Sequence, residues 1–171
     1  MPFTPLHMGP GMAVKALAGE RFSLLAFGVA QVAMDIEPLV QMVRGAPVLH
    51  GMTHTYLAAM VIAAAVALVA PAPCRLLLRK WNRELAFVRL PWLASPQPLK
   101  RLPVIAGAFT GTLSHVALDS LMHGDIRPLA PWSDANGLYG LIPSSALHLA
   151  CIASGALGLA AWVAFRWKSS R

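Results

Sequence analysis

The amino-acid sequence predicts an all-α integral membrane helical bundle, with about four spanning helices and a short N-terminal re-entrant or hairpin helix. Charged residues make up only 12% of the chain, whereas soluble domains carry about 25%. Apolar residues, at 57%, gather into four long segments. The basic residues gather between two of these segments and at the C-terminal end, a pattern typical of cytoplasmic flanks. We expect residues 1–171 to form a single membrane-embedded domain.

The four apolar segments cover residues 22–43, 56–70, 102–122 and 146–167. A helix that crosses a bilayer needs about 20 predominantly apolar residues. The third and fourth segments meet this length. The first is long enough but becomes polar near its end, and the second is short and is followed by two prolines.

Residues 8–18 predict a short helix that descends into the membrane, after which Gly19 turns the chain into the first apolar segment. Such a helix cannot cross alone and must be covered by protein. This hairpin places His7 beside Asp35, whereas a simple four-span arrangement leaves His7 in the cytoplasm. The N-terminus has no basic stretch followed by an apolar run, so we expect no cleavable signal peptide.

The basic residues predict the orientation. Segment 74–101 is rich in Lys and Arg, so we expect a cytoplasmic basic loop there and the basic C-terminal tail on the same side. Segment 124–145, rich in Pro, Gly and Asn, then becomes an extracytoplasmic loop. The net charge of +7 is expected to face anionic membrane lipids. No nucleic-acid binding is expected, because aromatic residues do not alternate with the basic ones.

The titratable side chains converge on the extracytoplasmic level, although the orientation was derived from Lys and Arg alone. Five of the six histidines lie there. Charged or imidazole groups inside a bilayer are costly and mark a function. The converging residues are Asp35, Glu37, His50, His54, His115, Asp119, His123, Asp125 and His148.

The stretch SHVALDSLMHGD carries His115, Asp119 and His123 at a four-residue spacing. On a helix this spacing puts them on one face, with Cβ atoms about 5–6 Å apart. Two imidazoles flanking a carboxylate suit zinc or a similar divalent ion, and Asp119 can bridge two ions. His50 and His54, in HGMTHT, repeat the spacing. The ligands outnumber those of one tetrahedral site, so we expect two divalent ions, with zinc favoured and a third left open.

Four residues near these motifs each admit two interpretations. His148 is either a metal ligand or a hydrogen-bonded packing residue. Asp125 and Glu37 either orient the water or a ligand imidazole, or are helix-end residues at the membrane interface. Arg127 either clamps a phosphate or carboxylate or touches headgroups. We take Asp125, Glu37 and Arg127 as the candidate catalytic residues.

The segments MPFTPLHMGPG, MDIEP, HGMTHT and SHVALDSLMHGDIRP resemble a family of small bacterial membrane proteins, the YdjM-like group of membrane-bound metal-dependent hydrolases. The resemblance extends to about residue 137. It implies a multi-pass hydrolase of the bacterial cytoplasmic (inner) membrane, and it does not specify a substrate.

A more distant similarity is to zinc-dependent phospholipase C and the related single-strand nucleases, which are all-helical enzymes with three zinc ions. Those enzymes use a processed N-terminal Trp and an acidic ligand after the last His. This chain begins with Met1 and has no acidic residue after His148, so the third ion stays open. The ligand order that the similarity implies here is His7, Asp35, His50 or His54, His115 with Asp119, His123, and His148.

These observations predict a membrane-bound metal-dependent hydrolase that uses a metal-activated water on a phosphoester of a lipid or lipid-linked substrate. The alternative is a metal-binding or metal-transporting membrane protein without hydrolytic activity. A transporter would carry ligands along a path across the membrane. A structural protein would instead use its polar residues to join helices in pairs, with the histidines pointing apart.

Overall fold

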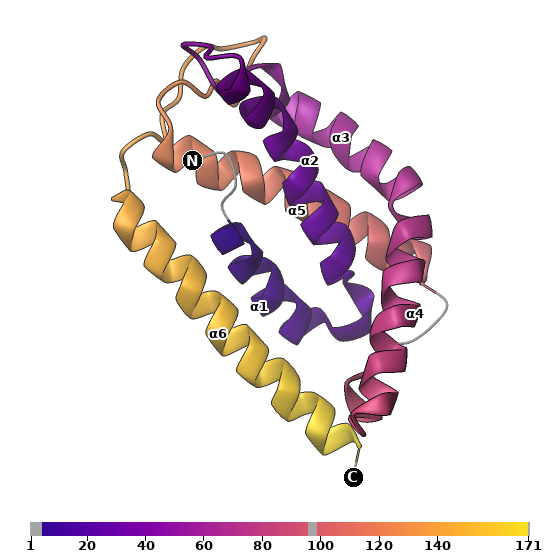
Figure 1. Cartoon of the computed structure of the whole chain (residues 1–171). Helices are drawn as coiled ribbons and strands as arrows, with labels where there is room; N and C mark the ends of the chain where they lie inside the picture. The colour runs from indigo at the N-terminus through magenta and orange to yellow at the C-terminus, as the bar shows by residue number, and fades with distance from the viewer. Residues whose placement is uncertain (1–4, 96–98, 171) are drawn as a thin grey trace.

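The computed structural model describes residues 5–95 and 99–170. These residues form helices and turns without any strand, which confirms the predicted all-α class. Short 3₁₀ turns lie at Pro5–His7, Gly19–Arg21, Met52–His54 and Pro91–Leu93. The α-helices (Figure 1) are α1 (Met8–Ala18), α2 (Leu24–Val43), α3 (Tyr56–Val69), α4 (Pro71–Phe87), α5 (Arg101–Met122) and α6 (Ser144–Ser169).

The short helix α1 lies inside the bundle, packed against α6 on one side and against α2 on the other (Figure 1). Gly19 turns the chain with a φ of 56°, a left-handed conformation that glycine adopts without steric cost. The Nζ atom of Lys15 donates to the carbonyl oxygens of Gly19 and Phe22, at 2.8 and 3.1 Å. The predicted N-terminal hairpin is therefore present, and protein covers its short helix.

Helix α5 is central to the fold, because it packs against both α2 and α3. Glycines allow this close approach. A Cβ atom at Gly107 of α5 would lie 2.3 Å from the carbonyl oxygen of Ser23, and one at Gly158 of α6 would lie 2.6 Å from the backbone nitrogen of Ala13. The two tight helix contacts therefore hold α5 against the start of α2, and α6 against α1.

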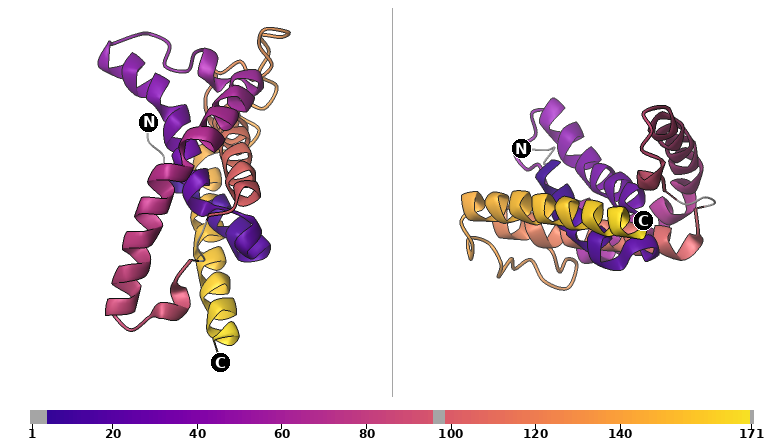
Figure 2. Two further views of the ribbon diagram at one scale, coloured as in Figure 1. Left: turned by 90° about the vertical axis from the view of Figure 1, so that its right-hand side faces the viewer. Right: turned by 90° about the horizontal axis from the view of Figure 1, so that it is seen from below.

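By length and composition, α2, α5 and α6 can each cross a membrane. Helices α3 and α4 meet the same test only as a pair, which is bent by 57° at the break between them. The two helices form one bent column on the outside of the bundle, visible in the side view of Figure 2. Residues 5–95 and 99–170 thus contain three candidate spans, or up to four if the bent pair is one span.

The prediction of a loop over 74–101 was wrong for the first half of that segment, because α4 continues to Phe87. We interpreted Pro71 and Pro73 as a stop, but proline is tolerated in the first turn of a helix, and Pro71 is the first residue of α4. The buried residues of α4, namely Cys74, Leu78 and Leu85, follow the helical period.

Candidate metal centre

The predicted histidines gather at one end of the bundle. His54 lies in the turn before α3, His115 and Asp119 lie on the last turns of α5, and His7 comes directly before α1. In Figure 1 the loops at this end lie opposite the C-terminus and the end of α4. The basic segments and the histidine cluster therefore occupy opposite ends of the molecule, as the sequence predicts.

Asp119 is the centre of the cluster, and its side chain is only 5% exposed. Its Oδ2 atom lies 3.1 Å from Nε2 of His115 and 3.5 Å from Nε2 of His54. Its Oδ1 atom lies 3.5 Å from Nε2 of His7. Three imidazoles thus present the same ring nitrogen to one carboxylate.

The tautomer of His115 follows from Gln31. The Nε2 atom of Gln31 donates to the carbonyl oxygen of Gly111 at 3.2 Å, which turns the amide oxygen of Gln31 toward His115. That oxygen lies 2.6 Å from Nδ1 of His115, and an amide oxygen can only accept. In its neutral form, His115 therefore carries its proton on Nδ1, and Nε2 presents a lone pair to Asp119.

Thr53 holds the imidazole of His54 in the same tautomer, with the proton on Nδ1. The hydroxyl of Thr53 donates to Oε2 of Glu37, and the backbone nitrogen of Thr53 donates to the same oxygen at 2.9 Å. Since its single proton is used, the Thr53 oxygen accepts from Nδ1 of His54, at 3.1 Å. In the neutral form of His54, Nε2 therefore carries no proton, and it also faces Asp119.

His50 is held by Asp125. Its Nδ1 atom lies 3.0 Å from Oδ1 of Asp125, and its backbone nitrogen donates to Oδ2 at 3.2 Å. Burial lowers the pKa of the His50 imidazole, which favours its neutral form. Burial also raises the pKa of Asp125, but its hydrogen bonds with His50 outweigh this effect and leave the pKa below its ordinary value. Asp125 therefore stays ionised and fixes the proton of His50 on Nδ1.

These tautomers set unprotonated nitrogens against the carboxylate oxygens of Asp119, so that acceptors face acceptors. Among the described residues, no hydrogen-bond partner is present for four buried ring nitrogens, namely Nε2 of His54, Nε2 of His115 and both ring nitrogens of His7. Each such atom costs about 1–3 kcal/mol. Burial lowers the pKa of His7 to about 4, so at neutral pH His7 does not form an ion pair with Asp119. A bound cation would supply the missing partner for Nε2 of His54, for Nε2 of His115 and for one of the two ring nitrogens of His7, because a neutral imidazole offers a single lone pair.

Within the part of the chain that the structure describes, three groups of side chains have ligand atoms within 4.8 Å of one another. Asp119 belongs to two of the groups, one with His7 and His115 and one with His50 and His54. The third group joins His50 to two residues after α5, His123 and Asp125. Imidazole and carboxylate donors suit zinc and similar divalent ions. The buried groups can therefore hold a metal ion.

His123 is in the cluster, but the prediction that it shares a helix face with His115 and Asp119 was wrong. Helix α5 ends at Met122, and His123 is extended, with φ of −119° and ψ of 120°. Its ring centroid lies 4.4 Å from that of His50. The four-residue spacing fails here because the chain leaves the helix one residue too early.

The other predicted site residues fall at different distances from this centre. Oδ1 of Asp35 lies 3.5 Å from Nε2 of His115, and Oε2 of Glu37 lies 4.0 Å from Nδ1 of His54. His148 is half-buried on α6 and belongs to none of the three groups. Arg127 pairs with Asp134 at 3.1 Å on the exposed surface. The phosphate clamp assigned to Arg127 stays a prediction.

Gln31 and Thr53 were not among the predicted site residues, although they contact Nδ1 of His115 and Nδ1 of His54. A signal was present for each. Gln31 precedes Asp35 by four residues on α2, so the two share a helix face. Thr53 directly precedes His54. A buried amide on the same face as a candidate ligand carboxylate indicates a partner for a ligand imidazole.

Comparisons with protein-family models, with curated proteins and with solved structures give no match for this chain. The resemblance to the YdjM-like group therefore stays a prediction, and the argument for a function rests on the geometry of the cluster.

Proposed function

We propose that this protein is a membrane-bound metal-dependent hydrolase that cleaves a phosphoester of a lipid or lipid-linked substrate. The observation that carries the proposal is the set of three buried imidazole nitrogens around Asp119, at 3.1 to 3.5 Å from its oxygens. In the neutral rings, the nitrogens of His54 and His115 in this set carry no proton. Such an arrangement is unfavourable without a cation. Zinc is the favoured metal because all the donors are imidazole nitrogens or carboxylate oxygens.

Two ions fit the donors best. One oxygen of Asp119 faces His7, and the other faces His54 and His115. Asp119 would serve as a ligand in both groups that contain it, one completed by His7 and His115 and the other by His50 and His54, and two ions held in this way would activate water for hydrolysis. A third ion at His123 and Asp125 would need His50, which also belongs to the group with His54 and Asp119. This sharing argues against full occupancy of all three groups.

When bound, such a pair of ions supplies an activated water and neutralises charge on the phosphoryl oxygens. The reaction consumes one water, whose hydroxyl bonds to phosphorus. The bond between phosphorus and the leaving oxygen breaks, and the remaining proton of the water ends on the leaving alcohol. Asp125 and Glu37 act as positioning residues in this proposal, because they hold His50 and, through Thr53, His54 in the tautomers that bind metal.

The location of the cluster supports a membrane substrate. The cluster lies where the candidate spans α2 and α5 end, which is the level of lipid headgroups in a bilayer. The basic segments at the other end of the bundle favour a cytoplasmic position for that end. The site then faces the extracytoplasmic side of the bacterial cytoplasmic membrane.

The test combines metal content with hydrolysis. The protein is purified without a His tag, reconstituted in nanodiscs and quantified for metals by mass spectrometry. Turnover is measured on a phospholipid, a polyprenyl-linked phosphodiester and a soluble nitrophenyl phosphodiester. Asp119→Asn is compared with Asp134→Asn, which changes an exposed carboxylate in the same way. We expect stoichiometric metal and turnover in the wild type and in the Asp134 variant, and neither in the Asp119 variant.

Two outcomes would overturn the proposal. Stoichiometric metal without turnover of any phosphoester would favour the alternative, a metal-binding or metal-transporting protein. Folded, monodisperse wild-type protein that holds no metal would remove both the hydrolase and the transporter.

A further inference from the structure

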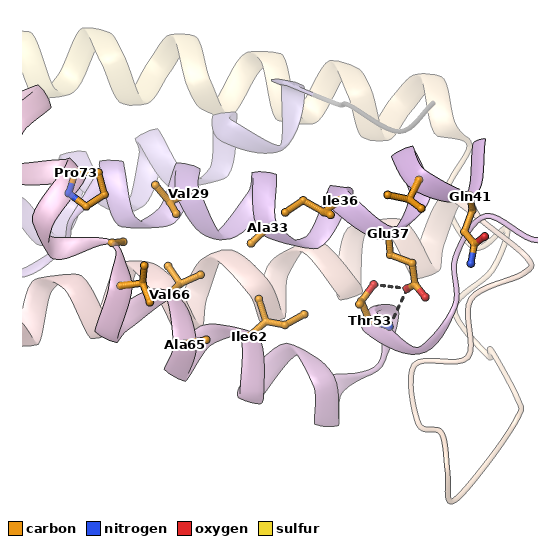
Figure 3. Close-up of a pocket in the computed structure, with 13 residues that line it drawn as sticks. Val29, Ala33, Ile36, Glu37, Gln41, Thr53, Ile62, Ala65, Val66 and Pro73 are labelled. Carbon is orange, nitrogen blue, oxygen red and sulfur yellow. Dashed lines mark hydrogen bonds between the residues drawn. The ribbon is translucent and has the colours of Figure 1, made fainter. Parts of the chain in front are cut away.

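A groove of about 620 Å³ runs between α2 and α3 on the outer face of the bundle (Figure 3). Most of its lining is apolar, and its polar residues gather at one end. In Figure 3 the apolar end lies near Pro73 and the polar end near Gln41. The apolar walls come from Val29, Ala33 and Ile36 of α2 and from Ile62, Ala65 and Val66 of α3.

The length of the groove matches one leaflet of a bilayer. It extends along α2 from Val29 to Gln41, which at about 1.5 Å per residue is about 18 Å. The hydrocarbon core of a bilayer is about 30 Å thick, so one leaflet is about 15 Å deep. A long acyl chain is the apolar molecule present at this depth, and a groove on the face of a spanning helix is open to it.

The polar end of the groove is connected to the metal centre. Glu37 and Thr53 line this end and are hydrogen-bonded to each other (Figure 3). Thr53 accepts from Nδ1 of His54, whose opposite nitrogen lies 3.5 Å from Asp119. One imidazole ring therefore separates the end of the groove from the centre of the cluster.

We propose that this groove binds an acyl chain of the lipid substrate and sets the phosphoester at the His54 end, beside the metal ions. The inference rests on the proposed function for its chemistry and specifies the substrate class as a long-chain amphiphile. A chain that moves from the bilayer into the groove gains little from the hydrophobic effect, because both surroundings are apolar. The groove contributes orientation of the scissile bond instead.

The test fills the groove with an indole. Ala65→Trp places a bulky ring in the groove, and Ala156→Trp makes the same change at an exposed position of α6. Each variant is assayed on a dipalmitoyl phospholipid and on its dibutyryl analogue with the same headgroup. We expect Ala65→Trp to lower kcat/KM for the long-chain substrate by about tenfold or more, since misplacement of a substrate is costly. Its turnover of the short-chain analogue should stay at the wild-type level, and Ala156→Trp should change neither rate.

A second measurement is independent of turnover. A phospholipid with a diazirine on its palmitoyl chain is photolysed in nanodiscs with each variant, and the labelled peptides are mapped. We expect label on α2 and α3 of the wild type and of Ala156→Trp, and its loss in Ala65→Trp. Equal labelling of α2, α3 and α6, unchanged by Ala65→Trp, would reduce the groove to general lipid contact and overturn the inference. Groove labelling in a protein that hydrolyses neither substrate would preserve the lipid site and remove the hydrolase.

Discussion

Asp119→Asn should abolish the effect of metal on the stability of this protein. The substitution keeps the shape of the side chain but replaces one carboxylate oxygen by an NH₂ donor. In the structure this side chain faces three imidazole nitrogens at 3.1 to 3.5 Å. Without metal, the amide can donate to one nitrogen that otherwise has no partner. With metal, the variant lacks the ligand that two of the groups share.

The magnitudes follow from these contacts. A metal present at 100 times its Kd stabilises the wild type by about 2.7 kcal/mol. For a chain of this size that corresponds to a rise in Tm of about 5–10 °C. We expect almost no rise in Asp119→Asn. In chelator the variant should unfold at the wild-type temperature or above it, because one new hydrogen bond contributes about 1 kcal/mol.

The assay is thermal unfolding in mild detergent, followed by near-ultraviolet circular dichroism, with either chelator or zinc. Asp134→Asn is the control, because Asp134 is exposed and pairs only with Arg127 among the contacts described. Its two unfolding curves should match those of the wild type within the small contribution of a surface ion pair, about 0–1 kcal/mol.

One result would refute the reasoning. If the imidazoles carry protons, Asp119 is the centre of a buried ion-pair network and needs no metal. Removing its charge would then destabilise the chelator-treated protein by about 3–5 kcal/mol. A large fall in Tm of Asp119→Asn in chelator, with no response of the wild type to zinc, would show that the assigned tautomers are wrong.

Two further predictions concern residues that position the site. Gln31→Leu should weaken zinc binding by about 10–100-fold, because no side chain then holds the proton of His115 on Nδ1. Competition with a chromogenic chelator measures the zinc affinity, and Val32→Leu, on the exposed side of α2, is the control. Equal zinc affinities of the two variants would contradict the assigned tautomer of His115. Gly107→Ala should lower the free energy of unfolding by about 1–3 kcal/mol, because its Cβ would lie 2.3 Å from the oxygen of Ser23. Gly137→Ala, where a Cβ meets nothing within 4 Å, should unfold with the wild type, and identical curves for both glycine variants would refute the close approach of α5 to α2.

Local sequence patterns are sufficient to predict the helical class, most helix positions and most members of the cluster, although the predicted ligand His148 belongs to none of the three groups. Apolar length predicts a spanning helix such as α5 because the bilayer has a fixed thickness. Gly19 and the short segment before it predict the hairpin, since a helix of that length must turn back. His54, His115 and Asp119 could be selected because imidazoles and carboxylates in apolar segments are too costly to keep without a partner.

The tertiary structure alone decided how these side chains are used. Proline at a helix start and proline at a helix end look alike in sequence, so the continuation of α3 into α4 depends on packing of Leu78 and Leu85. The orientation of His123 depends on the residue at which α5 ends. That residue is set by the relative free energies of one more helical turn and of the loop conformation that follows. Gln31 meets His115 from another helix, 84 positions away in the chain. Contacts across such distances arise only when helix faces pack, and no local pattern specifies them.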